Sequence, residues 1–389
     1  MSDRFTALLN DCQDPITLAH SIVNARYDTA KDWHAAGGKV VGYLCDNVPI
    51  ELITAAGFLP CRLGGTDLPK REKYAQLIST QGRVSGFGLS VAILESLLNS
   101  ECDFVDHLVI PHNRKAIEAT FGQLSRACAR DADIKAPDTW LLDRTWLASG
   151  TSERFNTKQV LAFRAVLEEW RGKPITEEEL QSACQTHSDN RQLISTLMQL
   201  RQQQPASLKG SDALAIIRAG QLIPAEDYNQ LLKRVLEHAT SLPPLSGPRV
   251  FLAGSPFDHN QLYQTIEQAG GIVVGEDHCW GMRCVEHELG NAGDVMQQIC
   301  DRYDRTPGCS VTYPLQRNVD TCLLRAQASN AEAVIFAVMQ GDETHLWTTV
   351  DEKKAAEQAG LTTLQVSELD YNVSTDAQAV VANFVRSLK

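Results

Sequence analysis

The segment KVVGYLCDNVPIELITAAGFLPCRL, residues 39–63, decides the fold class. Its first six residues form a short apolar run that predicts a buried strand. Pro49 suits the first turn of a helix, where its missing N–H group costs nothing, and Gly57 suits the left-handed position that ends one. A second strand is expected at Leu59–Leu63. This strand–helix–strand spacing predicts a parallel sheet covered by helices.

The same pattern recurs along the chain. In the N-terminal part, further strands are expected at 104–110 and 140–142. A second series contains strands at 249–254, 272–274, 333–338 and 363–366, with helices at about 260–269, at 350–359 and from 375 onward. The two series predict two doubly wound, parallel-sheet α/β domains over residues 1–151 and 247–389.

A different region separates the two series. Val160, Phe163 and Leu167 recur at helical spacing, and Thr176 with Glu179 forms a capping box that begins another helix. The segment LPPLSGP, residues 242–248, has the composition of a linker. We therefore expect a helical insert and linker over residues 152–246.

Composition excludes several classes of protein. A chain of 389 residues exceeds what one hydrophobic core usually serves. Its net charge is −12, and no Lys/Arg-rich run stands out, which argues against a nucleic-acid partner. The first residues lack the apolar region of a signal peptide, and the apolar run 333–339 is too short to span a membrane. We expect a cytoplasmic protein without a membrane partner, whose eleven cysteines are reduced thiols.

Polar segments follow the predicted strands of both series. In doubly wound sheets, ligands bind beyond the carboxyl ends of the strands. The segments 45–49, 111–114, 255–258, 277–279 and 341–345 occupy such positions, and we expect them to line a site between the two domains. The alternative is that polar residues simply populate loops. The candidate catalytic residues are Cys45, Glu51 and His112, and the candidates for substrate binding are Ser255, Asp258, Asp277, Arg283 and His345.

Common motifs are incomplete or missing from the sequence. There is no Walker loop, and Gly86-Phe87-Gly88 does not complete a dinucleotide-binding fingerprint. Cys279 and Cys284 are not continued by the further cysteines of a ferredoxin series, and no zinc-binding spacing occurs. Generic motifs therefore do not assign a function.

The order and spacing of the segments resemble one family, the subunits of the 2-hydroxyacyl-CoA dehydratases and benzoyl-CoA reductases of the D-component type. The resemblance covers nearly the whole chain, although none of its segments is specific alone. It rests on GYLCDNVPIELI (42–53), AAG (55–57), PCRL (60–63), CDFVDHLVIPH (102–112), GKPITEEEL (172–180), NR (190–191), GSP (254–256), DHCWGMR (277–283), CS (309–310) and ELDY (368–371).

The resemblance implies a fold and an activity. Members of this family are built of two flavodoxin-like domains, work as pairs of homologous subunits and carry 4Fe–4S clusters. A separate ATP-dependent activator protein supplies one electron at low potential. That electron reduces an acyl-CoA thioester to a ketyl radical, which permits elimination of an unactivated hydroxyl group or reduction of an aromatic ring.

The chain departs from the family where the cluster is held. The positions that resemble those of the family's cluster cysteines carry Phe87, Arg114 and Asp342. Clusters are held by thiolates, and an arginine cannot replace one, so we expect no standard cluster in this chain. Because the resemblance implies that the three positions converge, Arg114 and Asp342 are predicted to form an ion pair beside Phe87. The alternative is that both side chains point into solvent. Cys45, Cys279 and Cys309 could instead form a different thiolate site, or they could be small residues near a pocket.

Three functions remain open from the sequence. The chain could be a subunit of an ATP-activated acyl-CoA dehydratase (a hydro-lyase) or reductase, with a homologous partner that supplies the cluster. It could be a non-catalytic binding or scaffold protein that kept the fold. It could also be a redox protein that uses Cys45, Cys279 and Cys309. The sequence does not name the acyl group.

Overall fold

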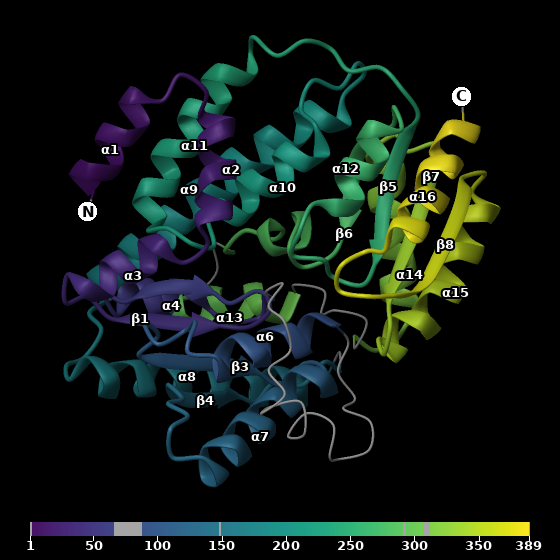
Figure 1. Cartoon of the computed structure of the whole chain (residues 1–389). Coiled ribbons are helices and arrows are strands. Elements are labelled where there is room, and N and C mark those ends of the chain that lie inside the picture. The colour runs from purple at the N-terminus through teal and green to yellow at the C-terminus, as the bar shows by residue number, and fades with distance from the viewer. Residues whose placement is uncertain (1, 66–87, 148, 291–292, 306–311, 389) are drawn as a thin grey trace.

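Two parallel four-stranded sheets organise the computed structural model, which describes residues 2–65, 88–147, 149–290, 293–305 and 312–388 (Figure 1). The first sheet has the order β2-β1-β3-β4 and the second the order β6-β5-β7-β8. Among the described residues, each order corresponds to 2-1-3-4, the first four strands of the flavodoxin-like arrangement. The predicted α/β class is confirmed. The strands are β1 Val40–Tyr43, β2 Leu59–Arg62, β3 His107–Pro111, β4 Asp138–Leu142, β5 Arg249–Gly254, β6 Ile272–Asp277, β7 Ala333–Met339 and β8 Thr362–Leu369.

Both faces of the first sheet are buried, as the continuous apolar run in β1 predicts. Val40 and Leu108 pack in one core beneath α3 (Asp28–Ala35), α6 (Gly88–Leu98) and α7 (Lys115–Arg130). Val41 and Val109 point to the opposite face, because successive side chains of a strand alternate. That face is covered by α4 (Ile50–Ala55) and α8 (Gly150–Arg171).

The second sheet is covered in the same way. Val250 and Ile335 face α12 (Gln261–Gln268) and α16 (Thr375–Ser387). Phe251 and Phe336 face α14 (Gln316–Ala328) and α15 (Glu343–Gln358). The helix predicted at 350–359 begins earlier, at Glu343, because the Asp342 side chain caps it by accepting a hydrogen bond from the backbone N–H of His345.

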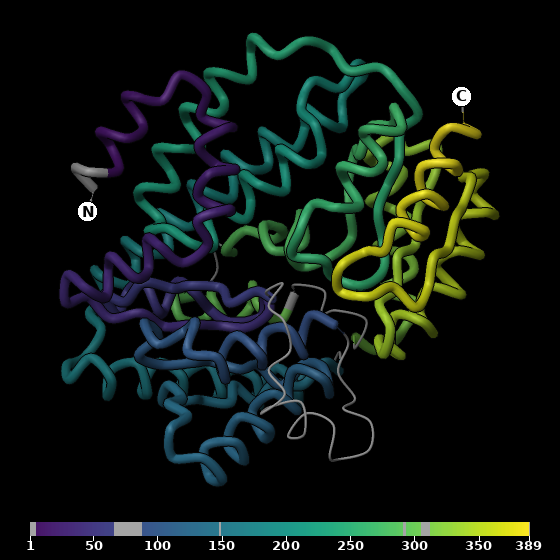
Figure 2. Tube along the Cα trace, in the orientation of Figure 1, coloured from purple at the N-terminus to yellow at the C-terminus, as the bar shows by residue number. Residues whose placement is uncertain are grey.

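A third group of helices, here called the helical layer, lies beside the two sheets, as Figure 1 and the trace in Figure 2 show. It contains α9 (Glu177–Gln202), α10 (Gly210–Ala219) and α11 (Ala225–Ala239). The capping box predicted at Thr176 and Glu179 is present, with both of its hydrogen bonds. The N-terminal helices α1 (Ser2–Asp11) and α2 (Pro15–Ala25) pack on α11 and α10. Within the described residues, no helix has the length and apolar character needed to cross a membrane.

The chain returns to the first sheet after β6. The 3-10 helix η1 (Met282–Val285) follows β6, and α13 (Val295–Arg305) then packs against the first sheet and α8. Ile299 and Tyr303 of α13 lie in the same core as Val41 of β1. A segment between two strands of the second sheet thus completes the core of the first, which the strand pattern did not predict.

The packing of α8 against the first sheet yields a stability prediction. Phe163 is fully buried in that core, whereas Leu161 on the same helix is 46% exposed. Phe163→Ala should lower the free energy of unfolding by about 3–5 kcal/mol, because it leaves a cavity. Leu161→Ala should change it by less than about 1 kcal/mol. Urea unfolding followed by circular dichroism measures both, and equal effects would contradict the placement of α8.

Candidate functional site

A buried ion pair joins the loops of the two sheets. Arg114 follows β3 and precedes α7, and Asp342 follows β7 and caps α15. Arg114 Nη1 lies 3.1 Å from Asp342 Oδ2, and both side chains are 3% exposed. The predicted ion pair is therefore confirmed, although Phe87, its predicted neighbour, lies outside the described residues.

Further polar groups complete the surroundings of Asp342. Ser255 Oγ donates a hydrogen bond to Asp342 Oδ2 over 2.6 Å, and His345 Nδ1 lies 2.8 Å from the same oxygen. Ser255 Oγ also accepts a bond from the backbone N–H of Met339. Burial raises the pKa of Asp342, but the charge of Arg114 and the contact with His345 outweigh it and hold that pKa far below its usual value. Asp342 is therefore ionised at neutral pH.

The network extends to the loop that follows β1. Asn113 Oδ1 accepts a hydrogen bond from the backbone N–H of Arg114, and Asn113 Nδ2 donates one to Asn47 Oδ1 over 2.9 Å. Segments 45–49, 111–114, 255–258 and 341–345 are thus linked through side chains, as expected for strands whose carboxyl ends face each other. The structure brings together Ser255, His345, Arg114 and Asp342 among the residues singled out from the sequence.

These residues do not fit a 4Fe–4S cluster. Iron in such clusters is bound by thiolate sulfurs, whereas the guanidinium of Arg114 has no lone pair to offer. The carboxylate of Asp342 is already occupied by Arg114, Ser255 and His345. The network is therefore a fully hydrogen-bonded ion pair rather than a metal site.

The alternative cysteine site remains a prediction. Cys45 is partly buried and has a positive φ of 60°. Cys279 is buried, and its Sγ accepts a hydrogen bond from Arg62 Nη2 over 3.1 Å. Cys309 lies outside the described residues. In the described ranges, no three His, Cys, Asp or Glu side chains are grouped so that they could hold a metal ion.

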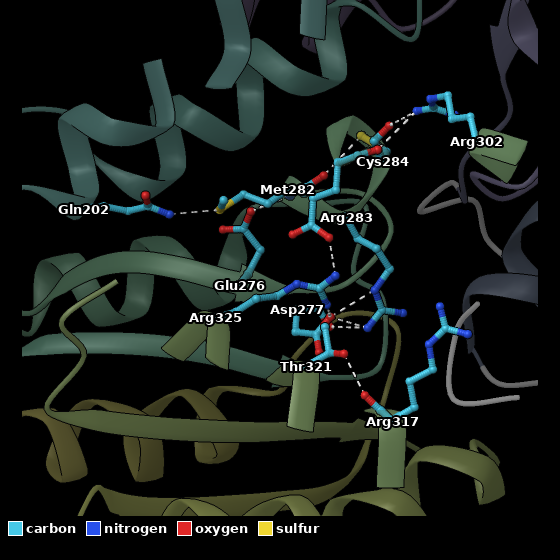
Figure 3. Close-up of polar contacts among 12 residues, drawn as sticks. Gln202, Glu276, Asp277, Met282, Arg283, Cys284, Arg302, Arg317, Thr321 and Arg325 are labelled. Carbon is cyan, nitrogen blue, oxygen red and sulfur yellow. Dashed lines mark hydrogen bonds and ion pairs between the residues drawn. The ribbon is translucent and has the colours of Figure 1, made fainter. Parts of the chain in front are cut away.

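Asp277 and Arg283 form a second network, drawn in Figure 3. Arg283 Nε donates to Asp277 Oδ1 over 2.9 Å, and Arg325 of α14 reaches the same oxygen and also pairs with Glu286. Burial raises the pKa of Asp277, but Arg283 and Arg325 hold it well below its usual value. Asp277 and Arg283 thus bind other protein groups, and Arg325 connects α14 to Asp277 at the end of β6 and to Glu286 after it.

Two other predicted residues lie apart from the central ion pair. His112 is about half exposed, and its Nδ1 lies 2.7 Å from Asp143 Oδ1. Asp258 is buried and accepts hydrogen bonds from the backbone N–H of Gly65 and from the hydroxyl of Tyr371. Asp258 thus connects the first and second sheets at a separate point.

Glu51 faces the helical layer instead of the loops. It is fully buried in α4, where its oxygens accept hydrogen bonds of 2.8 Å from Arg191 of α9 and Tyr303 of α13. Burial raises its pKa, but Arg302 and Arg191 outweigh this and lower that pKa to about 2. A cavity of about 70 Å³ lies beside this group, and it is lined by Asp46, Arg62, Gln221, Cys284, Tyr303 and other residues.

The sequence patterns did not predict that residues of the helical insert line this cavity. Arg191 and Gln221 come from α9 and the end of α10, where helical periodicity predicts only a packed face. The signal that could have identified them is their type, because a charged or amide side chain on a buried helix face requires a partner.

The fold places the chain in the doubly wound α/β class, and comparison with known proteins narrows this class to one family. The family model for 2-hydroxyglutaryl-CoA dehydratase, D-component, matches residues 45–383. The chain is 27% identical over 285 residues, 70% of each chain, to one of the subunits of benzoyl-CoA reductase from Thauera aromatica. The chain belongs to the 2-hydroxyglutaryl-CoA dehydratase D-component family, as the resemblance in the sequence predicted.

Two further relatives carry related names. The (R)-phenyllactyl-CoA dehydratase beta subunit of Clostridium sporogenes is 21% identical over 388 residues, 98% of this chain and 97% of that protein. The beta subunit of (R)-2-hydroxyglutaryl-CoA dehydratase from Acidaminococcus fermentans is 20% identical over 338 residues, 83% of this chain and 85% of that protein. Each similarity extends across both sheets.

The ion pair between Arg114 and Asp342 can be tested by a double-mutant cycle. Arg114→Met or Asp342→Leu alone leaves one buried charge unpaired and should destabilise the protein by about 3–5 kcal/mol. The double variant should be less destabilised than the sum of the two, with a coupling free energy of at least about 1 kcal/mol. Urea unfolding measures all four proteins, and additive effects would contradict a direct interaction.

The lowered pKa of Glu51 predicts a pH dependence. A pKa of about 2 in the folded protein, against roughly 4.3 when unfolded, means that its ionised form stabilises the fold. This stabilisation is fully present above the unfolded pKa and is lost as the pH falls toward 2. Glu51→Gln should therefore cost about 3 kcal/mol at pH 7, and the difference from the unsubstituted protein should shrink below about pH 4.

The exposed Glu169 of α8 provides the control for this experiment. Glu169→Gln should leave both stability and its pH dependence nearly unchanged. Thermal unfolding at intervals between pH 7 and pH 3 measures the trend. A Glu51→Gln penalty that stays constant down to pH 3 would show that Glu51 is not held ionised by Arg191 and Arg302.

Proposed function

We propose that this chain is one subunit of a 2-hydroxyacyl-CoA dehydratase or benzoyl-CoA-type reductase. In this proposal it works in the cytoplasm with a homologous, cluster-bearing subunit and an ATP-dependent activator protein, on an acyl-CoA thioester. The observation that carries the proposal is the buried Arg114–Asp342 pair in a chain whose residues 45–383 match the family model. The two opposite charges at these positions compensate each other. This favours a chain that has kept a function over one that has lost it.

The names of the relatives support a role as a subunit. The benzoyl-CoA reductase chain and the two dehydratase beta chains are each named as one subunit of an enzyme that acts on a CoA thioester. A chain whose own residues do not fit the cluster gains a function in such an enzyme if a homologue carries it. The non-catalytic scaffold is the competing function.

The residues of this chain have definite tasks under the proposal. Arg114, Asp342 and Ser255 hold the loops of both sheets in one arrangement without a metal. The loops 45–49 and 277–283 then present polar groups beside them, where part of the acyl-CoA pocket would lie. The low-potential electron would come from the activator and the cluster of the partner chain.

Iron content and assembly test the proposal together. Purified alone without oxygen, this chain should contain far fewer than four iron atoms per chain. Co-expressed with a cluster-bearing homologue, it should form a stable complex with an interface on the order of 1,600 Å² or more. Iron and acid-labile sulfide analysis, followed by size-exclusion chromatography with light scattering, makes both measurements.

Matched variants separate the alternatives. Cys45→Ser and Cys279→Ser should leave the iron content of the complex unchanged. Stoichiometric iron in the isolated chain, lost in either variant, would support the redox protein that uses Cys45 and Cys279. A monomer that does not bind the co-expressed homologue would contradict the role as a subunit. A stable complex that lacks dehydratase and reductase activity would favour the scaffold.

A further inference from the structure

A second cavity lies on the side of the molecule where the helical layer meets the second sheet. It has a volume of about 320 Å³, within the range of ordinary ligand sites. Helices α2, α10 and α12, which lie side by side in Figure 1, enclose it together with the loop after β8. The cavity is separate from the one beside Glu51 and is lined largely by polar side chains, among them Arg26, Arg218, Asp258, Asn260 and Tyr371.

Arg218 of α10 lines this cavity. Within the described part of the chain, its guanidinium makes no hydrogen bond, and its Nε is buried without a partner. The ring of Trp280 lies beside it, with its centroid 5.7 Å from the guanidinium carbon. Burial lowers the pKa of Arg218, although Asp258 acts in the opposite direction. Arg218 is partly exposed, but its buried Nε has no acceptor among the described residues, and an anionic ligand would supply one.

Arg26 is held in place beside the same cavity. Its Nη2 donates hydrogen bonds to the carbonyl of Gly65 over 2.9 Å and to the hydroxyl of Tyr27 over 3.2 Å. A guanidinium has five N–H donors, and the hydrogen bonds of Arg26 to the described residues all use Nη2. The remaining donors of an already oriented guanidinium are therefore available to a ligand.

The charges that line the cavity leave an excess of one positive charge. Arg26 and Arg218 are offset by the carboxylate of Asp258, which is already bonded to Gly65 and Tyr371. His20 at the same cavity is paired with Asp212. A bound anion would neutralise this excess charge. Phosphate groups are well suited, because a guanidinium can donate two parallel hydrogen bonds to them.

We propose that this cavity binds a phosphate or diphosphate group held by Arg218 and Arg26. The site adjoins the central loop network, because Asp258 and Ser255 belong to the same loop and Ser255 binds Asp342. The identification of that anion as the diphosphate of coenzyme A rests on the proposed function, whereas the anion site itself does not.

Isothermal titration calorimetry of the full chain with inorganic pyrophosphate and with coenzyme A tests the site. Both should bind, and Arg218→Gln should weaken both by roughly tenfold or more, since a charge-assisted contact is lost. Arg218→Lys keeps the charge but loses the planar fork, so its affinities should fall between the two. Arg234→Gln is the matched control, because Arg234 is exposed on α11 and pairs with Glu237 there.

The outcomes separate this inference from the proposed function. Coenzyme A binding much more tightly than pyrophosphate, with both dependent on Arg218, identifies a nucleotide-linked diphosphate, and equal affinities identify a free anion. Affinities that are unchanged in Arg218→Gln, or absent binding of both compounds, overturn the site. If Arg218→Gln does not fold, Arg218→Lys and protection of residues 210–219 from hydrogen exchange by pyrophosphate decide. The binding measurement needs no partner or activator. It can therefore confirm the anion site even if the role as a subunit is wrong, or contradict the site even if that role is right.

Discussion

The buried pair of Arg114 and Asp342 is the contact on which the arrangement of the two sheets depends. Either charge alone in this position would lose its hydration without gaining a partner, which is strongly destabilising. Ser255 and His345 occupy the remaining acceptor sites of the carboxylate, so the network is closed. Because Arg114 follows β3 of the first sheet and Asp342 follows β7 of the second, the pair also links the strand ends of the two sheets.

Two further buried ion pairs attach the helical layer to this core. Arg191 of α9 binds Glu51 of α4, and Arg201 near the end of the same helix binds Glu276 of β6 with distances of 2.5 and 2.8 Å. Through charges that are almost completely buried, helix α9 therefore contacts α4, which covers the first sheet, and β6 of the second sheet. Such pairs tolerate little displacement, since breaking one leaves an unpaired charge. The three groups of elements are thus held in one geometry.

This geometry shows how an ion pair can hold these loops together. Cysteine ligands from separate segments hold those segments together only when a cluster is bound. An ion pair between the same segments needs no cofactor, and it keeps the loops after β1, β3, β5 and β7 connected. The cavity at Arg26 and Arg218 lies at the other end of the β5–α12 loop, where it is open to an anion. The proposed subunit role and the proposed anion site thus use different parts of one frame.

Local sequence patterns were enough to predict most of the strands and helices. Apolar runs, Pro49, Gly57 and the Thr176 capping box specify strands and helices because they act over one or two turns of the chain. The ion pair of Arg114 with Asp342 was also predictable, since the family resemblance required those positions to converge. The tertiary structure alone decided that α13 packs on the first sheet, that Glu51 binds Arg191, and that Arg218 lies in a cavity. Such contacts join residues distant in sequence, and they arise from the summed packing of the whole chain, which no local pattern encodes.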